Sequence, residues 1–441
     1  MHKLAKQLVT ENLYTIVGTF IITSAMILAI FVVRNITIEP VSDFLGYYKN
    51  ALRIADGHLA FTPFKPVGYN YLLGIWMRIT NDTSVNNAKL LNLVLYGLSL
   101  ILSLRIGNLA FSRLLSRIIW LILFSFSPIF IFYLPILGIE TPVLTILTAI
   151  LVAHLEKQIK PVIRCFTIGV LCALLASIRV YFLLLPLILG FSEFLEIRHF
   201  KKSLYFTIAS SCIMFILLSP LTYMCYITTG SFMLVPSNSS TVLFLNNNDS
   251  STTGRLVPMQ HISKTPELEG ELAQLDDQSR PYQDALRREA IKWICENPAE
   301  FTKLGVLRLK QIFFTDNFFE YTFNEVRHAH LTQDQKRSEN MVVNLLSIIQ
   351  SWLGILGLGI VFTNFSSIVQ SMRLGNSIDK IVSLPVLLVL FQLGIYFASE
   401  GQPRYYFYFH LPILLALTGS IQLRNSPPIR FTEGLTKQGV S

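Results

Sequence analysis

The stretch that decides the fold is residues 12–33, NLYTIVGTFIITSAMILAIFVV, which carries no charged side chain. A helix needs about 20 apolar residues to cross the hydrocarbon core of a membrane, and this run has that length. No small-residue cleavage site accompanies it, so we interpret it as a retained first span and not as a signal peptide. The polar segment SDFLGYYKNALRIADG (residues 42–57) follows shortly after it. We therefore expect the rest of the chain to be organised around membrane crossings.

The composition of the whole chain agrees with this expectation. The 441 residues are 52% hydrophobic and only 14% charged, whereas a soluble domain usually carries about 25% charge. The net charge is +9, but the Lys and Arg residues fall in short clusters between apolar runs, as in membrane proteins and not as on a nucleic-acid-binding surface. We therefore expect membrane lipids, and no nucleic acid, as partners. The five cysteines show no metal-ligand spacing.

Further apolar runs bring the expected number of crossings to about ten. Residues 118–155 and 165–195 are each too long for one span, so each is interpreted as two, with turns at 137–141 and around Arg179. The other expected spans are residues 12–33, 87–109, 203–226, 341–362, 381–398 and 405–423. The predicted fold class is an all-α polytopic membrane protein.

The positions of the basic clusters predict the orientation, because cytoplasmic loops carry an excess of Lys and Arg. With the N-terminus in the cytoplasm, the clusters at 113–117, 157–164, 198–202, 373–380 and 424–430 all fall on that side. Two long segments, 34–86 and 228–340, are then outside. We expect an N-terminal transmembrane module (1–227), a large outer loop (228–340) and a C-terminal transmembrane module (341–441) that ends in a short cytoplasmic tail.

The two outer segments have their own predicted structure. In 34–86, apolar positions at helical spacing predict interfacial helices that begin near Asp43 and near Tyr69. In the large loop, the Ser-, Asn- and Thr-rich stretch 237–254 predicts a mobile loop. Residues 282–314 predict an amphipathic helix on the outer membrane surface, broken or kinked at Pro298. Its expected apolar face is Ala285, Ile291, Ile294, Phe301, Leu304 and Leu307.

Charged side chains near a membrane core are costly, so those that remain outside the basic clusters are candidates for function. On the outer side they are Asp43, Lys65, Glu140, Arg179, Glu400 and Arg404. They come from different loops, yet the topology places all of them on one face. A helix bundle can therefore bring them together around one cleft.

Two of these candidates lie in the first outer segment. Asp43 begins the predicted helix of residues 42–57, where Asp43 or Ser42 either caps the helix or Asp43 acts as a general base toward an acceptor hydroxyl. Lys65, in FTPFKPVGYNYLLG, is either an interfacial lysine that extends to the membrane surface or a point charge for a phosphate. The sequence leaves both alternatives open.

The other candidates come from later loops. Glu140 is either favoured by the dipole of the helix that it begins or a second carboxylate that faces Asp43 and orients an acceptor or holds a divalent cation. Arg179 interrupts an apolar run and needs a partner. Glu400 and Arg404, in SEGQPRYY, either pair with each other or leave Arg404 to bind a phosphate or pyrophosphate through both arms of its guanidinium.

These residues together resemble the first outer loop of the polytopic glycosyltransferases that use polyprenyl-phosphate sugars, the C fold class. That class includes protein O-mannosyltransferases and the transferase that adds aminoarabinose to lipid A. The matching residues are Asp43, Tyr47, Pro63, Lys65, Pro66, Gly68 and Tyr69. The hairpin with Glu140, the position of Arg179 and the spacing from Glu400 to Arg404 fit the same layout.

The resemblance implies an inverting transfer of a sugar from a polyprenyl-phosphate donor to a hydroxyl of a lipid, glycan or protein acceptor. The reaction would take place on the extracytoplasmic face of a membrane, which we expect to be a bacterial plasma membrane. The implied roles are base for Asp43, acceptor positioning for Glu140, phosphate binding for Lys65, Arg179 and Arg404, and substrate contact for Tyr47, Tyr69 and Glu400. Many relatives have a second acidic residue where this chain has Phe44, so a divalent cation remains an open expectation, and no other cofactor is expected.

Two other functions compete with this one. A lipid or solute transporter is typically built from paired inverted repeats with helices broken near mid-membrane, and no such symmetry is evident in the sequence. A polysaccharide polymerase or ligase also has many spans and a large outer loop, but favours catalytic Arg or His over an Asp at the exit of the first span. Both alternatives stay open at the level of sequence.

Overall fold

The computed structural model describes residues 2–36, 38–277, 279–315, 318–319 and 332–424, and these are helical without any strand. Within this part of the chain, eight helical segments are long and apolar enough to cross a membrane. They comprise α1 (His2–Asn35), α4 (Val85–Ala110), α5 (Leu114–Ser125) with α6 (Pro128–Phe132), α8 (Pro161–Ile178), η1 (Val180–Leu184) with α9 (Leu185–Ile197), α10 (Phe200–Thr229), α16 (Gln333–Leu374) and α17 (Lys380–Ala398). The predicted fold class, an all-α polytopic membrane protein, is confirmed.

Two further apolar helices, α7 (Glu140–Leu155) and α18 (Tyr406–Arg424), lie at the remaining two positions where spans were expected. The turn before α7 covers residues 133–139 and so begins earlier than predicted, because Pro128 starts the short helix α6 after a break in α5. Helix α16 has 42 residues, far more than the predicted span 341–362. No proline interrupts residues 333–374, so nothing in the local sequence ends the helix earlier. The expected cytoplasmic tail (425–441) lies outside the described residues.

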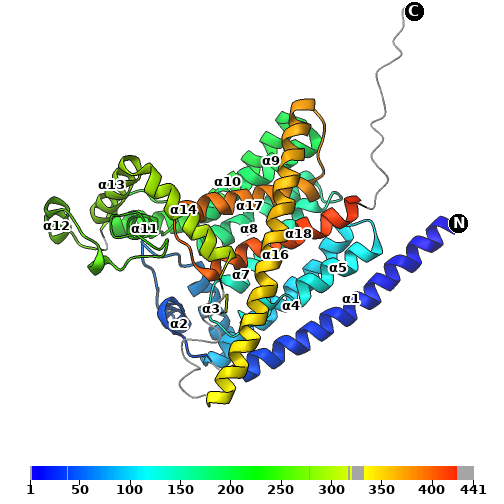
Figure 1. The fold of residues 1–441 in the computed structure, drawn as a ribbon, viewed down its shortest axis with the longest axis horizontal. Coiled ribbons are helices and arrows are strands. Elements are labelled where there is room, and N and C mark those ends of the chain that lie inside the picture. Colours follow the sequence, from blue (N-terminus) through cyan, green and yellow to red (C-terminus); the bar gives the residue numbers. More distant parts are fainter. Residues whose placement is uncertain (1, 37, 278, 316–317, 320–331, 425–441) are drawn as a thin grey trace, which may run out of the picture.

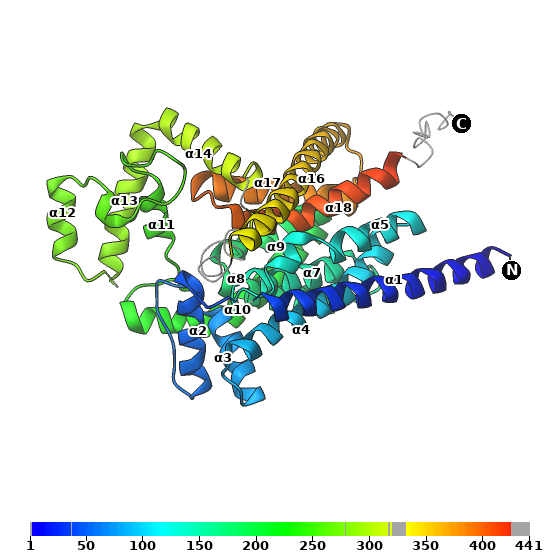
Figure 2. The ribbon, with the colours of Figure 1, turned by 60° about the horizontal axis from the view of Figure 1, so that its bottom comes forward.

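The helices run back and forth between two ends of the molecule. Figures 1 and 2 place the start of α1 and the end of α18 at one end, which we call the terminal end. The opposite end, which we call the cavity end, carries α2 (Ser42–Ala55), α3 (Gly68–Thr80) and the helices from α11 to α14. Helices α2 and α3 pack closely because Gly74 has no side chain: a Cβ there would lie 2.6 Å from Cβ of Ile54.

A lobe of helices projects from the cavity end. It consists of α11 (Ser239–Asn246), η2 (Met259–His261), α12 (Pro266–Ala273) and α13 (Arg280–Glu296), and α14 (Pro298–Phe313) joins it to α17. The prediction of a mobile loop at 237–254 was therefore wrong for residues 239–246, which form a helix whose Phe244 is buried in the lobe. The predicted break at Pro298 is confirmed, since this residue starts α14.

The lobe also changes the expected orientation of α13. Its buried side consists of Ala285, Leu286 and Ala290, which belong to the same small core as Phe244. Ile291, placed on the apolar face by the sequence, is 47% exposed. The prediction is thus confirmed for Ala285 and wrong for Ile291, because packing against α11 and α12 buries Leu286 and Ala290 instead.

Candidate functional site

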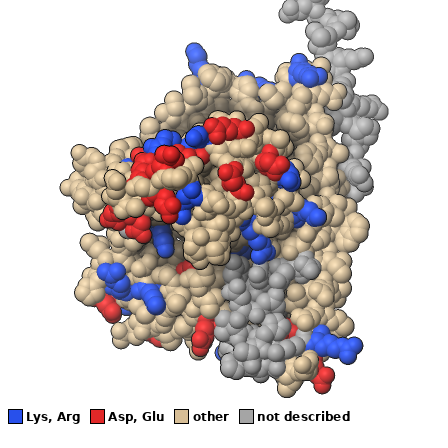
Figure 3. Space-filling model, turned by 60° about the vertical axis from the view of Figure 1, so that its left-hand side comes forward, with Lys and Arg blue, Asp and Glu red and all other residues tan. Residues whose placement is uncertain are grey.

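A cavity of about 610 Å³ lies at the cavity end, where α2, the start of α3, the junction of α8 with η1, the lobe and the loop after α17 meet. Figure 3, which looks toward this end, shows charged side chains of both signs gathered on this face, while the flanks carry few. Six of the predicted site residues line the cavity, namely Asp43, Tyr47, Lys65, Arg179, Glu400 and Arg404. Segments more than 300 residues apart in the sequence thus supply one wall.

Gly68 explains how the first outer segment reaches this place. A Cβ at Gly68 would lie 2.2 Å from Oγ of Ser177 and 2.8 Å from the backbone carbonyl carbon of Ser177, so only glycine allows α3 to start against the end of α8. Ser177 is two residues before Arg179. The contact therefore sets Lys65 and Asn70, which both line the cavity, beside Arg179.

Asp43 does not cap α2. The N-cap residue is Val41, and no side chain makes a capping hydrogen bond there. The residue before Asp43, Ser42, has φ +50°, a left-handed conformation that is strained for a residue with a side chain. The carboxylate is 56% exposed, and its Oδ2 lies 3.5 Å from Nη2 of Arg404, longer than a strong charge-assisted hydrogen bond of about 2.8 Å. Asp43 therefore remains accessible from the cavity.

In the loop after α17, Glu400 and Arg404 make different contacts, which indicate different roles. Glu400 accepts a 2.7 Å hydrogen bond from the Tyr405 hydroxyl and a second one from the side-chain amide of Gln402. The Arg404 guanidinium lies 5.3 Å from the centroid of the Tyr405 ring and approaches Asp43. These contacts favour the alternative in which Glu400 fixes the loop and Arg404 faces the cavity.

Lys65 and Arg179 supply two further cations to the cavity. Lys65 is exposed and makes no hydrogen bond or ion pair with any residue that the structure describes. Arg179 has tyrosines around it: its Nη2 lies 3.3 Å from the Tyr408 hydroxyl, and its guanidinium lies 5.4 Å and 5.6 Å from the ring centroids of Tyr408 and Tyr405. The partner that the sequence required for Arg179 is thus an aromatic cage, which leaves its charge available to an anion.

Glu140 and Tyr69 lie behind the cavity wall and do not line it. Their exposed fractions are 2% and 1%. Tyr69 meets Tyr47 edge to face, with ring centroids 5.4 Å apart. Burial raises the pKa of both tyrosines, and the nearby Glu140 carboxylate adds to this for Tyr69. Both hydroxyls therefore keep their protons at neutral pH and can donate hydrogen bonds.

Sequence reasoning missed three residues at this site. Asn70 lines the cavity and is 2% exposed, and its place directly after Tyr69 in a motif already singled out was the available signal. Arg287 lines the cavity from α13. Arg308 does not belong to the expected apolar face of residues 282–314, yet it is fully buried.

Arg308 ties the lobe to the loop that carries Glu400. Its Nη1 donates to the carbonyl of Phe397 at 2.8 Å, and its Nη2 donates to Oδ1 of Asn247 at 3.0 Å and to the carbonyl of Asn246. Burial lowers the pKa of Arg308 to about 10, an effect that the nearby Glu400 opposes, so the guanidinium stays charged at neutral pH. Gly401 crosses directly over it, since a Cβ there would lie 2.5 Å from Cα of Arg308.

The side chains around the cavity were also tested as metal ligands. Among the residues that the structure describes, no group of three or more His, Cys, Asp or Glu side chains is placed to hold a metal ion. A divalent cation held by the protein alone does not fit this donor set.

The chain was compared with known proteins. No protein-family model matches the sequence, and no curated protein matches it. Among solved structures, it is similar to the archaeal oligosaccharyltransferase AglB from Archaeoglobus fulgidus in complex with an inhibitory peptide and a dolichol-phosphate, with a TM-score of 0.52 and 12% identity over 92% of this chain. The apo form of the Archaeoglobus fulgidus oligosaccharyltransferase gives a TM-score of 0.51 and 11% identity over 92% of this chain.

In both cases the match covers 50% of the longer protein, so this chain spans about half the length of these structures. At this level of identity the likeness concerns the fold. It agrees with the C fold class expected from the residues around Asp43. Over 92% of its length, the chain has a fold similar to that of half of this oligosaccharyltransferase.

Proposed function

We propose that the protein is an inverting glycosyltransferase that moves a sugar from a polyprenyl-phosphate donor to a hydroxyl of a lipid, glycan or protein acceptor. The observation that carries the proposal is that Lys65, Arg179 and Arg404 surround one cavity together with the accessible carboxylate of Asp43. The likeness in fold to an oligosaccharyltransferase that was solved with a dolichol-phosphate supports it. We place the cavity on the outer face of a bacterial plasma membrane, with both termini in the cytoplasm, because of the distribution of Lys and Arg.

In this mechanism the cations act on the donor phosphate. Lys65 and Arg404 bind its oxygens, and Arg179, held among tyrosines, adds a third positive charge. When the bond between the anomeric carbon and the phosphate oxygen breaks, the oxygen keeps the electron pair. The cations then stabilise the polyprenyl phosphate that leaves, and fixed charges aimed at a developing anion are among the largest catalytic effects.

Asp43 supplies the base. The acceptor oxygen attacks the anomeric carbon from the side opposite the phosphate, so the configuration inverts, and the acceptor proton passes to the Asp43 carboxylate. The 3.5 Å contact with Arg404 keeps the carboxylate beside the phosphate site without enclosing it. Tyr47 contacts substrate from the cavity wall, Tyr69 and Glu140 support that wall from behind, and Glu400 fixes the loop of Arg404. The described residues offer no donor set for a metal ion, so these side chains carry the reaction in this mechanism.

The test uses purified protein in liposomes with a panel of polyprenyl-phosphate sugars and a mixture of lipid and glycan acceptors. The Asp43→Asn variant is expected to lower kcat about 100- to 10,000-fold, the usual contribution of a general base, with donor binding retained. Asp56→Asn is the matched control, since Asp56 is exposed at the other end of the same helix, and it should keep full activity.

Three outcomes contradict the proposal. Full activity of the Asp43→Asn variant would show that Asp43 is not the general base. A reporter inserted between residues 43 and 86 that proves to be cytoplasmic would show that the chain has the opposite orientation in the membrane. Absence of transfer from every donor, combined with binding of another solute or with chain elongation of a polysaccharide, favours the transporter or the polymerase. A chelator added to the active protein tests the cation separately, and unchanged activity is expected.

A further inference from the structure

Several polar atoms behind and along the inner wall of the cavity have no hydrogen-bond partner in the described part of the chain. They are the hydroxyl of Tyr69, Oδ1 of Asn70, both carboxylate oxygens of Glu140 and Nε of Arg179. More than about 90% of buried polar groups in proteins are paired, and an unpaired one costs about 1–3 kcal/mol. Tyr69 and Glu140 lie behind the wall. A ligand in the cavity can therefore reach only the two of these residues whose side chains line it, Asn70 and Arg179.

Asn70 is the uncharged residue of this group whose side chain lines the cavity. It lines the cavity and is 2% exposed, and the structure gives its amide no hydrogen bond to the described residues. A carboxamide offers two donors and one acceptor oxygen. Hydroxyl groups on neighbouring ring carbons of a sugar each donate and accept, so they match this side chain without any charge on the ligand.

The position of Asn70 also fits a sugar attached to a phosphate. Asn70 follows Lys65 by five residues on one segment, and Gly68 presses that segment against Ser177. Tyr69 is fixed by its contact with Tyr47. A ligand whose phosphate meets Lys65 therefore has its first ring next to Asn70, as a phosphate-linked sugar requires.

We propose that Asn70 binds hydroxyl groups of the transferred sugar and so selects the donor, while Tyr69 and Glu140 lie behind the wall from which Asn70 reaches the sugar. The proposal rests on the glycosyltransferase function proposed above and specifies its substrate class as a sugar with free hydroxyls on the ring face that meets α3. The side chain that selects the sugar is uncharged, so a neutral sugar is favoured over an acidic or basic one.

The experiment measures kcat/KM for the best donor of the panel and for analogues that each lack one ring hydroxyl. In the native protein, kcat/KM for one analogue is expected to be about 10- to 100-fold lower than for the complete donor, because the missing hydroxyl leaves the Asn70 amide unpaired. In Asn70→Ala, the complete donor should fall by a similar factor while that analogue is nearly unchanged. The discrimination between the two donors therefore disappears in the variant.

Asn50→Ala is the matched control, because Asn50 lines the same cavity from α2 but has no unpaired buried atom, and it should preserve the discrimination. Asn70→Ser is made alongside, so that a folded variant is available, and thermal unfolding in detergent checks both. Equal loss for every donor in the Asn70 variants, or unchanged discrimination, overturns the proposal and means that only water meets the amide. Absence of transfer by the native protein instead refutes the underlying function, so the two failures are distinguishable.

Discussion

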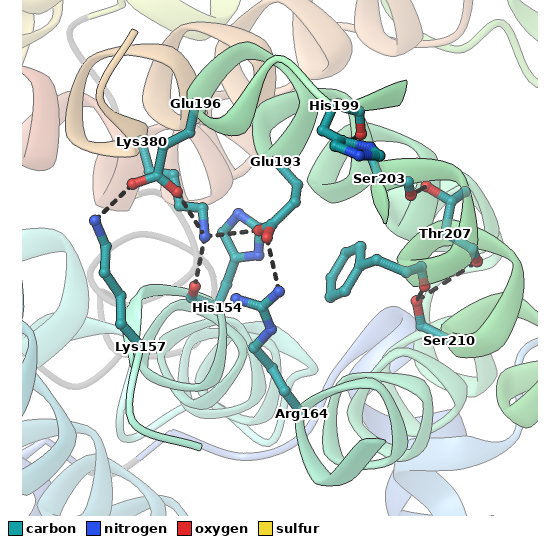
Figure 4. Close-up of polar contacts among 11 residues, drawn as sticks. His154, Lys157, Arg164, Glu193, Glu196, His199, Ser203, Thr207, Ser210 and Lys380 are labelled. Carbon is teal, nitrogen blue, oxygen red and sulfur yellow. Dashed lines mark hydrogen bonds and ion pairs between the residues drawn. The ribbon is translucent and has the colours of Figure 1, made fainter. Parts of the chain in front are cut away.

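The helices α7, α8, α9 and α17 carry buried polar groups at both of their ends, and the two ends treat them in opposite ways. At the terminal end, charges of opposite sign contact one another (Figure 4). Lys380, which is 2% exposed, lies 2.7 Å from Glu193 and 3.1 Å from Glu196. Arg164 pairs with Glu193 at 2.7 Å, and Lys157 pairs with Glu196 at 2.7 Å.

At the cavity end, the same helices begin or finish beside groups that protein atoms leave unpaired, such as the carboxylate of Glu140 and Nε of Arg179. The ring nitrogens of His154 and Nε of Arg164 at the terminal end also lack a partner among the described residues. However, the His154 ring packs against Phe206 inside the bundle, and the Arg164 guanidinium forms an ion pair through its Nη2. The difference teaches that burial of charge alone does not identify a site. A site is indicated where unpaired groups gather beside a cavity.

The largest expected effect on stability comes from removing a buried ion-pair partner at the terminal end. In Lys380→Met, Glu193 and Glu196 lose their shared partner while they remain buried, and loss of one member of a buried ion pair costs about 3–5 kcal/mol. Unfolding in mixed detergent micelles measures this free energy. Transfer by the protein that remains folded should be unchanged, because the cavity lies at the other end of these helices.

Lys157→Met is the matched control for that variant. It removes a lysine that contacts the same Glu196, but this lysine side chain is 74% exposed, and exposed pairs contribute at most about 1 kcal/mol. An equal loss of stability in the two variants would show that the burial of Lys380 does not increase the contribution of its ion pairs to the free energy of unfolding. The proposed difference between the two ends would then be wrong for the terminal end.

Arg308 gives the second test, because it is a buried charge at the cavity end whose Nη1 and Nη2 both donate to protein oxygens. Arg308→Met leaves the carbonyls of Phe397 and Asn246 without their donor, which is expected to cost about 2–3 kcal/mol, and KM should rise because the loop of Glu400 is no longer held. Arg288→Met is the control, since Arg288 is 57% exposed and pairs with Glu271 at the surface. If Arg308→Met left both stability and KM unchanged, pairing would not determine stability at this end.

The sequence predicted much of the fold because membrane spans depend on long apolar runs, which are local. It also predicted which charges share a face, since Asp43, Lys65, Arg179 and Arg404 do line one cavity. It did not predict that Glu140 is covered, or that α11 forms within a Ser- and Asn-rich stretch, because both depend on contacts with distant segments.

Arg308 shows the physical limit most clearly. Helical periodicity places a charged residue on the polar side, and nothing local reveals that Gly254, Gly401 and the carbonyl of Phe397 close over it from other parts of the chain. In the same way, the unpaired state of Asn70 is a property of the assembled wall and not of the motif around Tyr69.

The smallest expected effect on stability is a gain, and it tests the unpaired groups at the cavity end. Tyr69→Phe removes a buried hydroxyl that has no partner, so the free energy of unfolding should stay the same or rise by about 1 kcal/mol, while transfer falls. Tyr96→Phe is the matched control, because that buried hydroxyl donates to the carbonyl of Ser125 at 2.5 Å, and its loss should cost about 1 kcal/mol. A gain in stability that is coupled to a loss of transfer is characteristic of a group kept for a ligand. If Tyr69→Phe destabilised the protein as much as Tyr96→Phe, the hydroxyl would have a protein-bound role, and the cavity end would resemble the terminal end after all.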